Sequence, residues 1–385
     1  MDDFIKTYFA SGMKYREILL CLEKINGFKV SLRSLKRILS RMKLFRRINK
    51  SDQLSVGLYV MENVMTSSKQ LGYKMMHQKL LQEGYVVTQE TVRLMMHICD
   101  KEGIEQRRRT GLQRRMYLNL GPNYLWHIDG YDKLKPYGLC INGAIDGFSR
   151  FIIWLEVHKT NSDPKIIAGY FMNAVKHLQG CPTRARSDYG TENVYIRQMV
   201  IFLRGQRDEQ LTKSCFLRGS SNHNQRIERW WGILRNENVQ YWIDFFTMLK
   251  STGDFNGSFL DKAVLQFCFM DLIQEELNSI VKLWNNHRIR PSSNPNQPYG
   301  RPFLMYHCPG MFGCQDYLCR TSEAQVNLCL EESIQKGNVT CDETVFELCT
   351  IIMSDHNMMP AKTADDAALL YQFLRREILN ELHQD

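Results

Sequence analysis

The chain has 385 residues, of which 44% are hydrophobic and 11% aromatic, and this predicts two or three domains with a substantial core rather than a disordered chain. It contains neither a run of 18 or more apolar residues nor a basic-then-apolar leader, so the sequence predicts a soluble intracellular protein rather than a membrane or secreted one. Its twelve cysteines are scattered without CxxC pairs, and we expect neither zinc sites nor disulfides from them.

The net charge of +9 is unevenly distributed along the chain. Residues 1–120 carry 23 Lys and Arg against 11 Asp and Glu, whereas residues 311–385 carry 5 against 13. This asymmetry predicts a basic, polyanion-binding N-terminal part, a middle part with another task, and an acidic C-terminal part.

The basic N-terminal part contains an internal repeat. GFKVSLRSLKRI at 27–38 aligns with GYVVTQETVRLM at 84–95, and an amphipathic segment precedes each copy. Each copy predicts a helix, a glycine turn and a second helix, which is typical of DNA-binding helix-turn-helix units. We expect these units to span residues 1–50 and 51–106.

Local signals mark the turns and caps of these units. Gly27 and Gly84 are expected in the turns, and Ser31 and Thr88 are placed to cap the second helices. The predicted DNA contacts are Arg33, Lys36, Arg37 and Arg41 in the first copy and Arg93 in the second. Alternatively, both copies are helical hairpins that pack on each other with solvated charges, and for the charge-poor second copy both alternatives stay open.

A basic linker at residues 107–120 joins the second unit to the middle of the chain. It contains Arg107, Arg108 and Arg109. Three roles fit these arginines: contact with a phosphate backbone, a nuclear import signal, or a solvated hinge.

From residue 121 the pattern changes to alternating strands and helices. Strands are predicted at 124–129, 138–146, 151–157 and 182–188, and helices at 161–178, 191–205 and 224–249. Asp163 can cap the first of these helices, and Pro164 suits its first turn. Three antiparallel strands, a helix, a further strand and more helices predict an α/β layer with a mixed sheet.

Three acidic residues stand where such a sheet can bring them together. Asp129 ends the first strand, Asp188 ends the fourth, and Glu228 lies in the first turns of the helix that follows. Three carboxylates can hold two divalent cations that clamp the attacking and leaving oxygens at phosphorus, and magnesium suits oxygen ligands. A metal ion would also explain a glutamate among the arginines of SSNHNQRIERWWGILR at 220–235.

The motifs WHIDGYDKL, GAIDGFSRFIIWLEV, ARSDYGTEN and NHNQRIERWWGILR resemble the catalytic core shared by retroviral integrases, retrotransposon integrases and insertion-sequence transposases. The resemblance covers residues 121–306, including a post-core segment. It implies a ribonuclease H-like α/β fold, with a mixed five-stranded sheet flanked by helices, helix-turn-helix domains before it and a helical tail after it. The implied activity is that of a polynucleotidyl transferase, which processes DNA ends and joins them to a target duplex.

The resemblance also implies roles for individual residues. Asp129 would bridge two Mg²⁺ ions, for which Mn²⁺ can substitute, while Asp188 would complete one site and Glu228 the other. Further residues expected at the DNA are Asn193, Asn224, Arg226, Arg229 and Arg235. Multimers on element ends and target duplex are implied by the relatives, and DNA as substrate predicts a nuclear protein in a eukaryote or a cytoplasmic one otherwise.

Several polar neighbours are expected to be structural. Asp146 is expected in a hairpin, Glu192 as the cap of the helix that it opens, and His127 on the face of its strand opposite to Asp129. The acidic helical region at 307–385 is expected to pack against the core or a partner chain.

Two features depart from the retroviral integrases. The stretch between Asp188 and Glu228 is longer, which predicts an enlarged loop at 204–221, and the His-His-Cys-Cys zinc domain is missing. Two alternatives to a DNA-joining enzyme stay open. One is a domesticated nucleic-acid-binding protein that has lost catalysis, and the other is a ribonuclease H-like nuclease that cleaves without joining.

Overall fold

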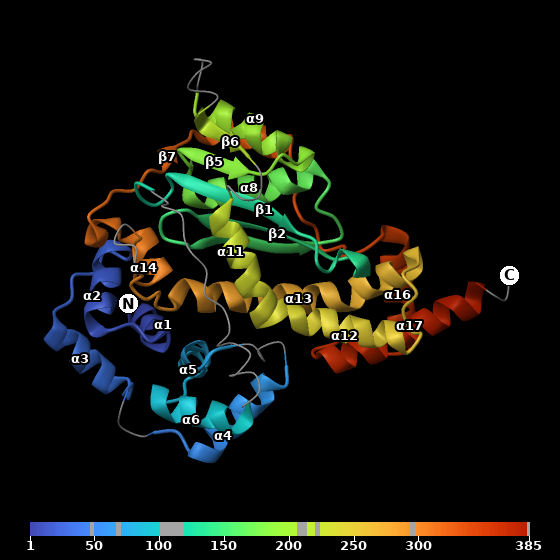
Figure 1. The fold of residues 1–385 in the computed structure, drawn as a ribbon, viewed down its shortest axis with the longest axis horizontal. Helices are drawn as coiled ribbons and strands as arrows, with labels where there is room; N and C mark the ends of the chain where they lie inside the picture. Colours follow the sequence, from blue (N-terminus) through green and yellow to red (C-terminus); the bar gives the residue numbers. More distant parts are fainter. Residues whose placement is uncertain are drawn as a thin grey trace.

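The structure is a computed structural model, and Figure 1 shows its main layers: a central sheet with helices on both faces, and the N-terminal helices grouped below one end of the long helix α13 (Phe259–Asn286). It describes residues 1–46, 50–66, 71–100, 119–205, 214–219, 224–292 and 297–382. In these stretches, no helix combines the length and apolar character needed to cross a membrane.

Five strands form the central sheet, in the order β3-β2-β1-β5-β6. The strands are β1 (Leu125–Tyr131), β2 (Cys140–Asp146), β3 (Ile152–His158), β5 (Arg184–Ser187) and β6 (Phe216–Arg218). β1, β2 and β3 are antiparallel, whereas β5 and β6 run parallel to β1, so the predicted mixed five-stranded sheet is confirmed. β6 lies inside the expected loop at 204–221, so this loop is shorter than predicted. Backbone pairing with β5 makes a strand of three residues that are too few to show an alternating hydrophobic pattern.

The turn between β2 and β3 depends on a buried aspartate. Asp146 accepts hydrogen bonds from the backbone N–H groups of Asn123, Phe148 and Ser149 and from the Ser149 hydroxyl. These four donors fill its acceptor positions, which confirms that Asp146 is a hairpin residue.

Side chains alternate between the two faces of β1, and each face packs against its own helices. Trp126 and Ile128 lie in the core beneath α8 (Pro164–Leu178), α9 (Val194–Leu203) and α15 (Glu323–Glu331). Tyr131 lies in the opposite core, with α11 (Gln225–Leu234), α12 (Gln240–Ser251) and α13 (Phe259–Asn286). The Asp163 side chain accepts from Lys165 N at the start of α8, as predicted, and Pro164 is in its first turn.

The helix predicted at 224–249 is present but is not uniform. α11 continues into α12 through a π-helical turn at Arg235–Val239. A single π turn adds one residue and rotates the side chains that follow, an effect that no local sequence pattern indicates.

In the described stretches, the N-terminal part contains six helices. They are α1 (Asp2–Ala10), α2 (Tyr15–Lys24), α3 (Leu32–Arg41), α4 (Gln53–Val64), α5 (Tyr73–Gln82) and α6 (Gln89–Cys99). Each repeat therefore has three helices, one more than predicted. Ser31 accepts from Ser34 N and Thr88 from Thr91 N, which confirms both caps, and both turn glycines have positive φ.

The acidic C-terminal region packs on the core. β7 (Cys319–Arg320) pairs with β4 (Gly180–Cys181), and α16 (Glu343–Asp355) and α17 (Ala364–Leu382) lie beside α13 (Figure 1). Ion pairs join Arg375 to Asp261 and Lys336 to Glu156. Of the two expected alternatives, packing against the core is confirmed.

Candidate active site

Of the three predicted metal-binding carboxylates, Asp129 lies on β1 and Asp188 directly follows β5, the parallel strand beside it. His127 of β1 is paired with Arg186 of β5. Continuing this register by two residues brings Asp129 opposite Asp188, which directly follows β5. The pairing of β1 with β5 ends at His127 and Arg186, and the charge of Asp188 acts on Asp129, so the two carboxylates lie near each other at this end of the sheet.

Glu228 approaches these carboxylates from α11, whose first turn is fastened to β1. Asn224 directly precedes the helix and is buried; its Nδ2 donates to the Ile128 carbonyl at 3.0 Å, and its Oδ1 lies 2.6 Å from His127 Nδ1. Burial lowers the pKa of His127 to about 3, so the ring is neutral and its Nδ1–H donates to Asn224. These two bonds fix the start of the helix against the strand that carries Asp129.

Trp231 forms a direct link between α11 and Asp129. Its indole N–H donates to Asp129 Oδ2 at 2.8 Å, and it lies three residues after Glu228 on the same helix. Residues two apart in a strand share a face, so His127 contacts the same helix as Asp129. The expectation that His127 and Asp129 lie on opposite faces of the strand is therefore wrong.

The three carboxylates act on one another electrostatically. The pKa of Asp129 is raised to about 7, first by burial and then by the charges of Glu228 and Asp188, while the Trp231 hydrogen bond opposes the rise. The pKa of Glu228 is also raised, by burial and by the charge of Asp188. The residues predicted as a triad from positions 129, 188 and 228 are therefore brought within range of one another's charge.

The donor set of this site suits a hard divalent cation. All three groups offer carboxylate oxygens, and across the described stretches none of the three forms an ion pair with a basic side chain. A cation would relieve the mutual repulsion that raises these pKa values. As the side chains stand, however, the described residues include no group of three His, Cys, Asp or Glu close enough to ligate one ion, so metal binding requires them to draw together.

Comparison with known protein families matches residues 116–309, slightly more than half of the chain, to the integrase core domain. The chain belongs to the integrase core domain family. A search of curated proteins finds no match. The match spans all five strands of the sheet together with α11 and α13, so the mixed sheet flanked by helices is the ribonuclease H-like integrase core, and the family is one of polynucleotidyl transferases.

A fourth carboxylate in this integrase core lies beside Asp188. The Glu192 side chain folds over Gly190, and the charges of Asp188 and Asp132 raise its pKa in addition to burial. It accepts a hydrogen bond from Asn193 Nδ2 at 2.7 Å and forms no helix-cap bond, so the predicted capping role is wrong. The one sequence feature that could have predicted that Glu192 lies near Asp188 is its position four residues after it.

Three of the residues predicted to contact DNA are buried or half-buried in the fold. Asn193 and Asn224 are buried, with 2% and 1% of their surface exposed, and a DNA contact by either of them stays a prediction. Arg226 is half-buried and its Nε donates to the Gly147 carbonyl at 3.1 Å, which anchors α11 to the β2–β3 turn. A phosphate contact by Arg226 stays a prediction.

The other predicted contacts remain available on the surface. Arg229 and Arg235 are exposed on the helix that carries Glu228. On the N-terminal helices, the predicted contacts that are exposed are Arg33, Lys36, Arg37, Arg41 and Arg93. Two of them already have partners, since Arg41 pairs with Asp2 and Arg93 with Glu90. Arg107, Arg108 and Arg109 lie outside the described residues.

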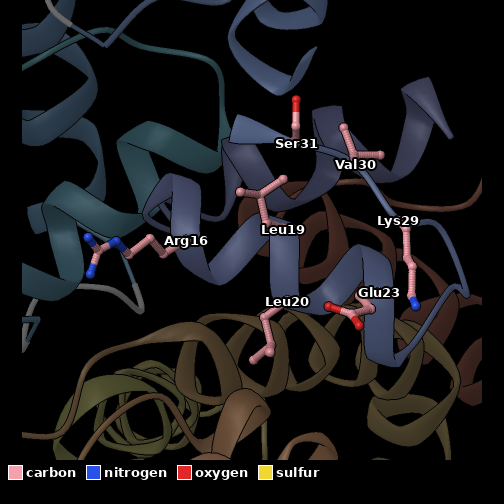
Figure 2. A pocket seen from close by; sticks show the side chains of 7 residues that line it. All are labelled: Arg16, Leu19, Leu20, Glu23, Lys29, Val30 and Ser31. Carbon is pink, nitrogen blue, oxygen red and sulfur yellow. The ribbon is translucent and has the colours of Figure 1, made fainter. Parts of the chain in front are cut away.

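An open pocket on the first repeat is separate from the carboxylates. It lies between α2 and the start of α3, and Figure 2 shows Arg16 at one end and Glu23 with Lys29 at the other. The remaining lining residues are Leu19, Leu20, Val30 and Ser31. Its walls mix acidic, basic and apolar groups, and this chemistry favours no particular ligand.

Proposed function

We propose that this chain is a DNA integrase or transposase that catalyses metal-dependent DNA end processing and strand transfer. The observation that carries the proposal is the convergence of Asp129, Asp188 and Glu228 from three separate elements of an integrase core, close enough to raise the pKa values of two of them. Carboxylates whose mutual repulsion raises their pKa values mark a candidate functional site, and their oxygens suit a hard divalent cation.

In this proposal the three carboxylates hold two Mg²⁺ ions, for which Mn²⁺ can substitute. When bound, the ions supply Lewis-acid stabilisation of the charge that develops on the phosphate oxygens. The protein holds the ligands in place: Trp231 donates to Asp129, and Asn224 fastens the helix of Glu228 to β1. Because metal-binding side chains depend on such partners for their orientation, these bonds belong to the proposed site.

DNA is the substrate in this proposal, both as element ends and as target duplex. Arg229 and Arg235 flank the proposed cation site on α11, and α3 offers a row of basic residues to a duplex. Contacts of this kind position the phosphate backbone and weaken as salt concentration rises.

The proposal is tested by strand-transfer assays with a panel of element-end DNAs in Mg²⁺ or Mn²⁺. Wild type should yield joined products, and Asp188→Asn should lose them while keeping its DNA affinity, because the change removes a ligand charge and leaves the basic surfaces intact. Asp355→Asn, which alters an exposed carboxylate on α16, is the matched control and should join DNA normally. Cleavage without joining would instead identify a ribonuclease H-like nuclease.

A second candidate is a domesticated DNA-binding protein without catalysis. It is favoured by one observation, that the described carboxylates do not approach closely enough to ligate a single ion as they stand. DNA binding with no reaction on any substrate, equal in wild type and Asp188→Asn, would support this candidate over the enzyme.

A further inference from the structure

Two cysteines face each other across the short sheet that joins the C-terminal region to the core. β4 (Gly180–Cys181) follows α8, and β7 (Cys319–Arg320) lies near the start of the C-terminal region. The two strands are antiparallel, and their register pairs Cys181 directly with Cys319. A covalent bond between these two residues would therefore fasten the C-terminal region to the core.

The backbone spacing of this pair suits a disulfide. Residues directly opposite each other in an antiparallel ladder have Cα atoms about 4.5–5.5 Å apart. Disulfides join residues whose Cα atoms are about 4.4–6.8 Å apart, so the register places Cys181 and Cys319 within that range. Gly180 allows the strands to approach closely, because a Cβ there would lie only 2.9 Å from the Cys319 carbonyl oxygen.

The side chains of the two cysteines contact the same hydrophobic core. Cys181 is buried in the core beneath α8 and α9, and Cys319 packs against that core. Thr183 Oγ1 lies 3.5 Å from the Cys319 sulfur, and Arg204 Nη1 contacts the same sulfur from the end of α9. Burial, and then the charge of Cys319, raise the pKa of Cys181 to about 12. The two sulfur atoms are therefore close enough for one to act on the other.

The two thiols differ in their access to solvent. Cys181 is 0% exposed, whereas Cys319 is half-buried. Cys99 and Cys314 are also half-buried, and the other nine cysteines are buried. Neither Cys99 nor Cys314 lies in a strand. A small oxidant therefore reaches Cys319 before it reaches Cys181, and Cys181 is the thiol placed to react next.

We propose that Cys319 and Cys181 form a redox-sensitive tether, which hydrogen peroxide closes and a thiol reductant opens. The Cys319 sulfur attacks one peroxide oxygen and the O–O bond breaks, which leaves a sulfenic acid on Cys319 and releases one water. The Cys181 sulfur then attacks the Cys319 sulfur, and the hydroxyl leaves with the Cys181 proton as a second water. The two sulfurs together lose two electrons, and one peroxide becomes two waters.

Such a bond is compatible with a reducing compartment. Disulfides in reducing compartments are usually transient and redox-sensing, and thiol exchange reopens them. The spacing of the cysteines along the chain does not indicate this pair, because Cys181 and Cys319 are far apart in sequence and meet only through the pairing of β4 with β7.

The pairing is tested on the full chain by hydrogen peroxide treatment, alkylation of the remaining thiols, and mass spectrometry of the disulfide-linked peptides. Wild type should yield two peptides joined through Cys181 and Cys319, which dithiothreitol separates. Cys319→Ser should lose this link and leave Cys181 as an alkylated thiol. Cys314→Ser, at another half-buried cysteine nearby in the chain, is the matched control and should form the link as wild type does.

The effect of the tether is measured by urea unfolding. Oxidised wild type should unfold at a higher urea concentration than the reduced protein, because a cross-link restricts the unfolded chain. Cys319→Ser should show no such shift. Circular dichroism checks that the variants fold, and the wild-type peptide map decides the pairing without any variant.

Three results of the peptide map would overturn the proposal. They are a Cys319 that stays reduced, a Cys319 that is oxidised only to sulfinic or sulfonic acid, and a Cys319 that is bridged to any other cysteine or to a second chain. A link between Cys181 and Cys319 that leaves the urea midpoint unchanged would overturn its role as a tether.

Discussion

At the scale of single residues, the site depends on how Asp129 is held. Burial and two neighbouring carboxylates raise its pKa, and the indole N–H of Trp231 opposes that rise by donating to the ionised form. The order of the sequence motifs predicts Asp129, Asp188 and Glu228. It does not predict the role of Trp231 or the burial of Asn224, because both depend on contacts across about a hundred residues of chain.

Trp231→Phe should weaken Mn²⁺ binding by about ten-fold, because removing a hydrogen-bond partner of a ligand disturbs its orientation and charge. Calorimetric titration of Mn²⁺ measures the change. Trp230→Phe is a close control: this neighbouring tryptophan is also buried, but its indole N–H has no hydrogen-bond partner among the residues that the structure describes. Equal losses in the two variants would mean that packing, not the bond to Asp129, sets the cation affinity.

At the scale of elements, the helix carrying Glu228 shows what sequence can and cannot predict. Its apolar spacing predicts one helix from 224 to 249, and a helix is there. The π turn after Leu234 is set by packing, since Asn238 and Trp242 both donate to Glu276 of α13. Glu237 in the same turn is half-buried, and its buried Oε2 has no hydrogen-bond partner among the described residues.

Burial raises the pKa of Glu237 from 4.5 to about 8. A raised carboxyl pKa means that the folded state favours the protonated form of Glu237. The contribution of this group to the free energy of unfolding is therefore full below about pH 4.5 and is lost as pH rises through 8. Glu237→Gln should therefore melt as wild type does at pH 4, and at a higher temperature than wild type at pH 9. Glu275→Gln, at an exposed position, should follow wild type throughout. A Glu237→Gln variant that gains nothing at pH 9 would contradict the buried, unpaired carboxyl.

At the scale of the whole molecule, the acidic C-terminal region completes the core. The sequence predicts its helices, but their docking site is settled by pairs far apart in the chain, such as Arg375 with Asp261. The strands follow from their alternating pattern, and Ser31, Thr88 and Asp163 correctly mark helix starts. The ion pair between Arg375 and Asp261 joins residues far apart in the chain, and such a pair leaves no local signal in a single sequence.

Arg375→Met should lower the free energy of unfolding by about 3–5 kcal/mol, because it leaves the buried carboxylate of Asp261 without its partner. Urea unfolding measures the change. Arg376→Met is the matched control, since the Arg376 side chain is 66% exposed and should contribute less than about 1 kcal/mol. Similar losses in both variants would show that the C-terminal helices do not depend on this ion pair.

The central claim is that Asp129, Asp188 and Glu228 together hold divalent cations. Anomalous diffraction from crystals of the full chain grown with Mn²⁺ tests it most directly. We expect manganese peaks bound by oxygens of all three side chains, and the loss of at least one peak in Asp188→Asn. Manganese absent from this face of the sheet in well-ordered wild-type crystals, or bound identically in the variant, would contradict it.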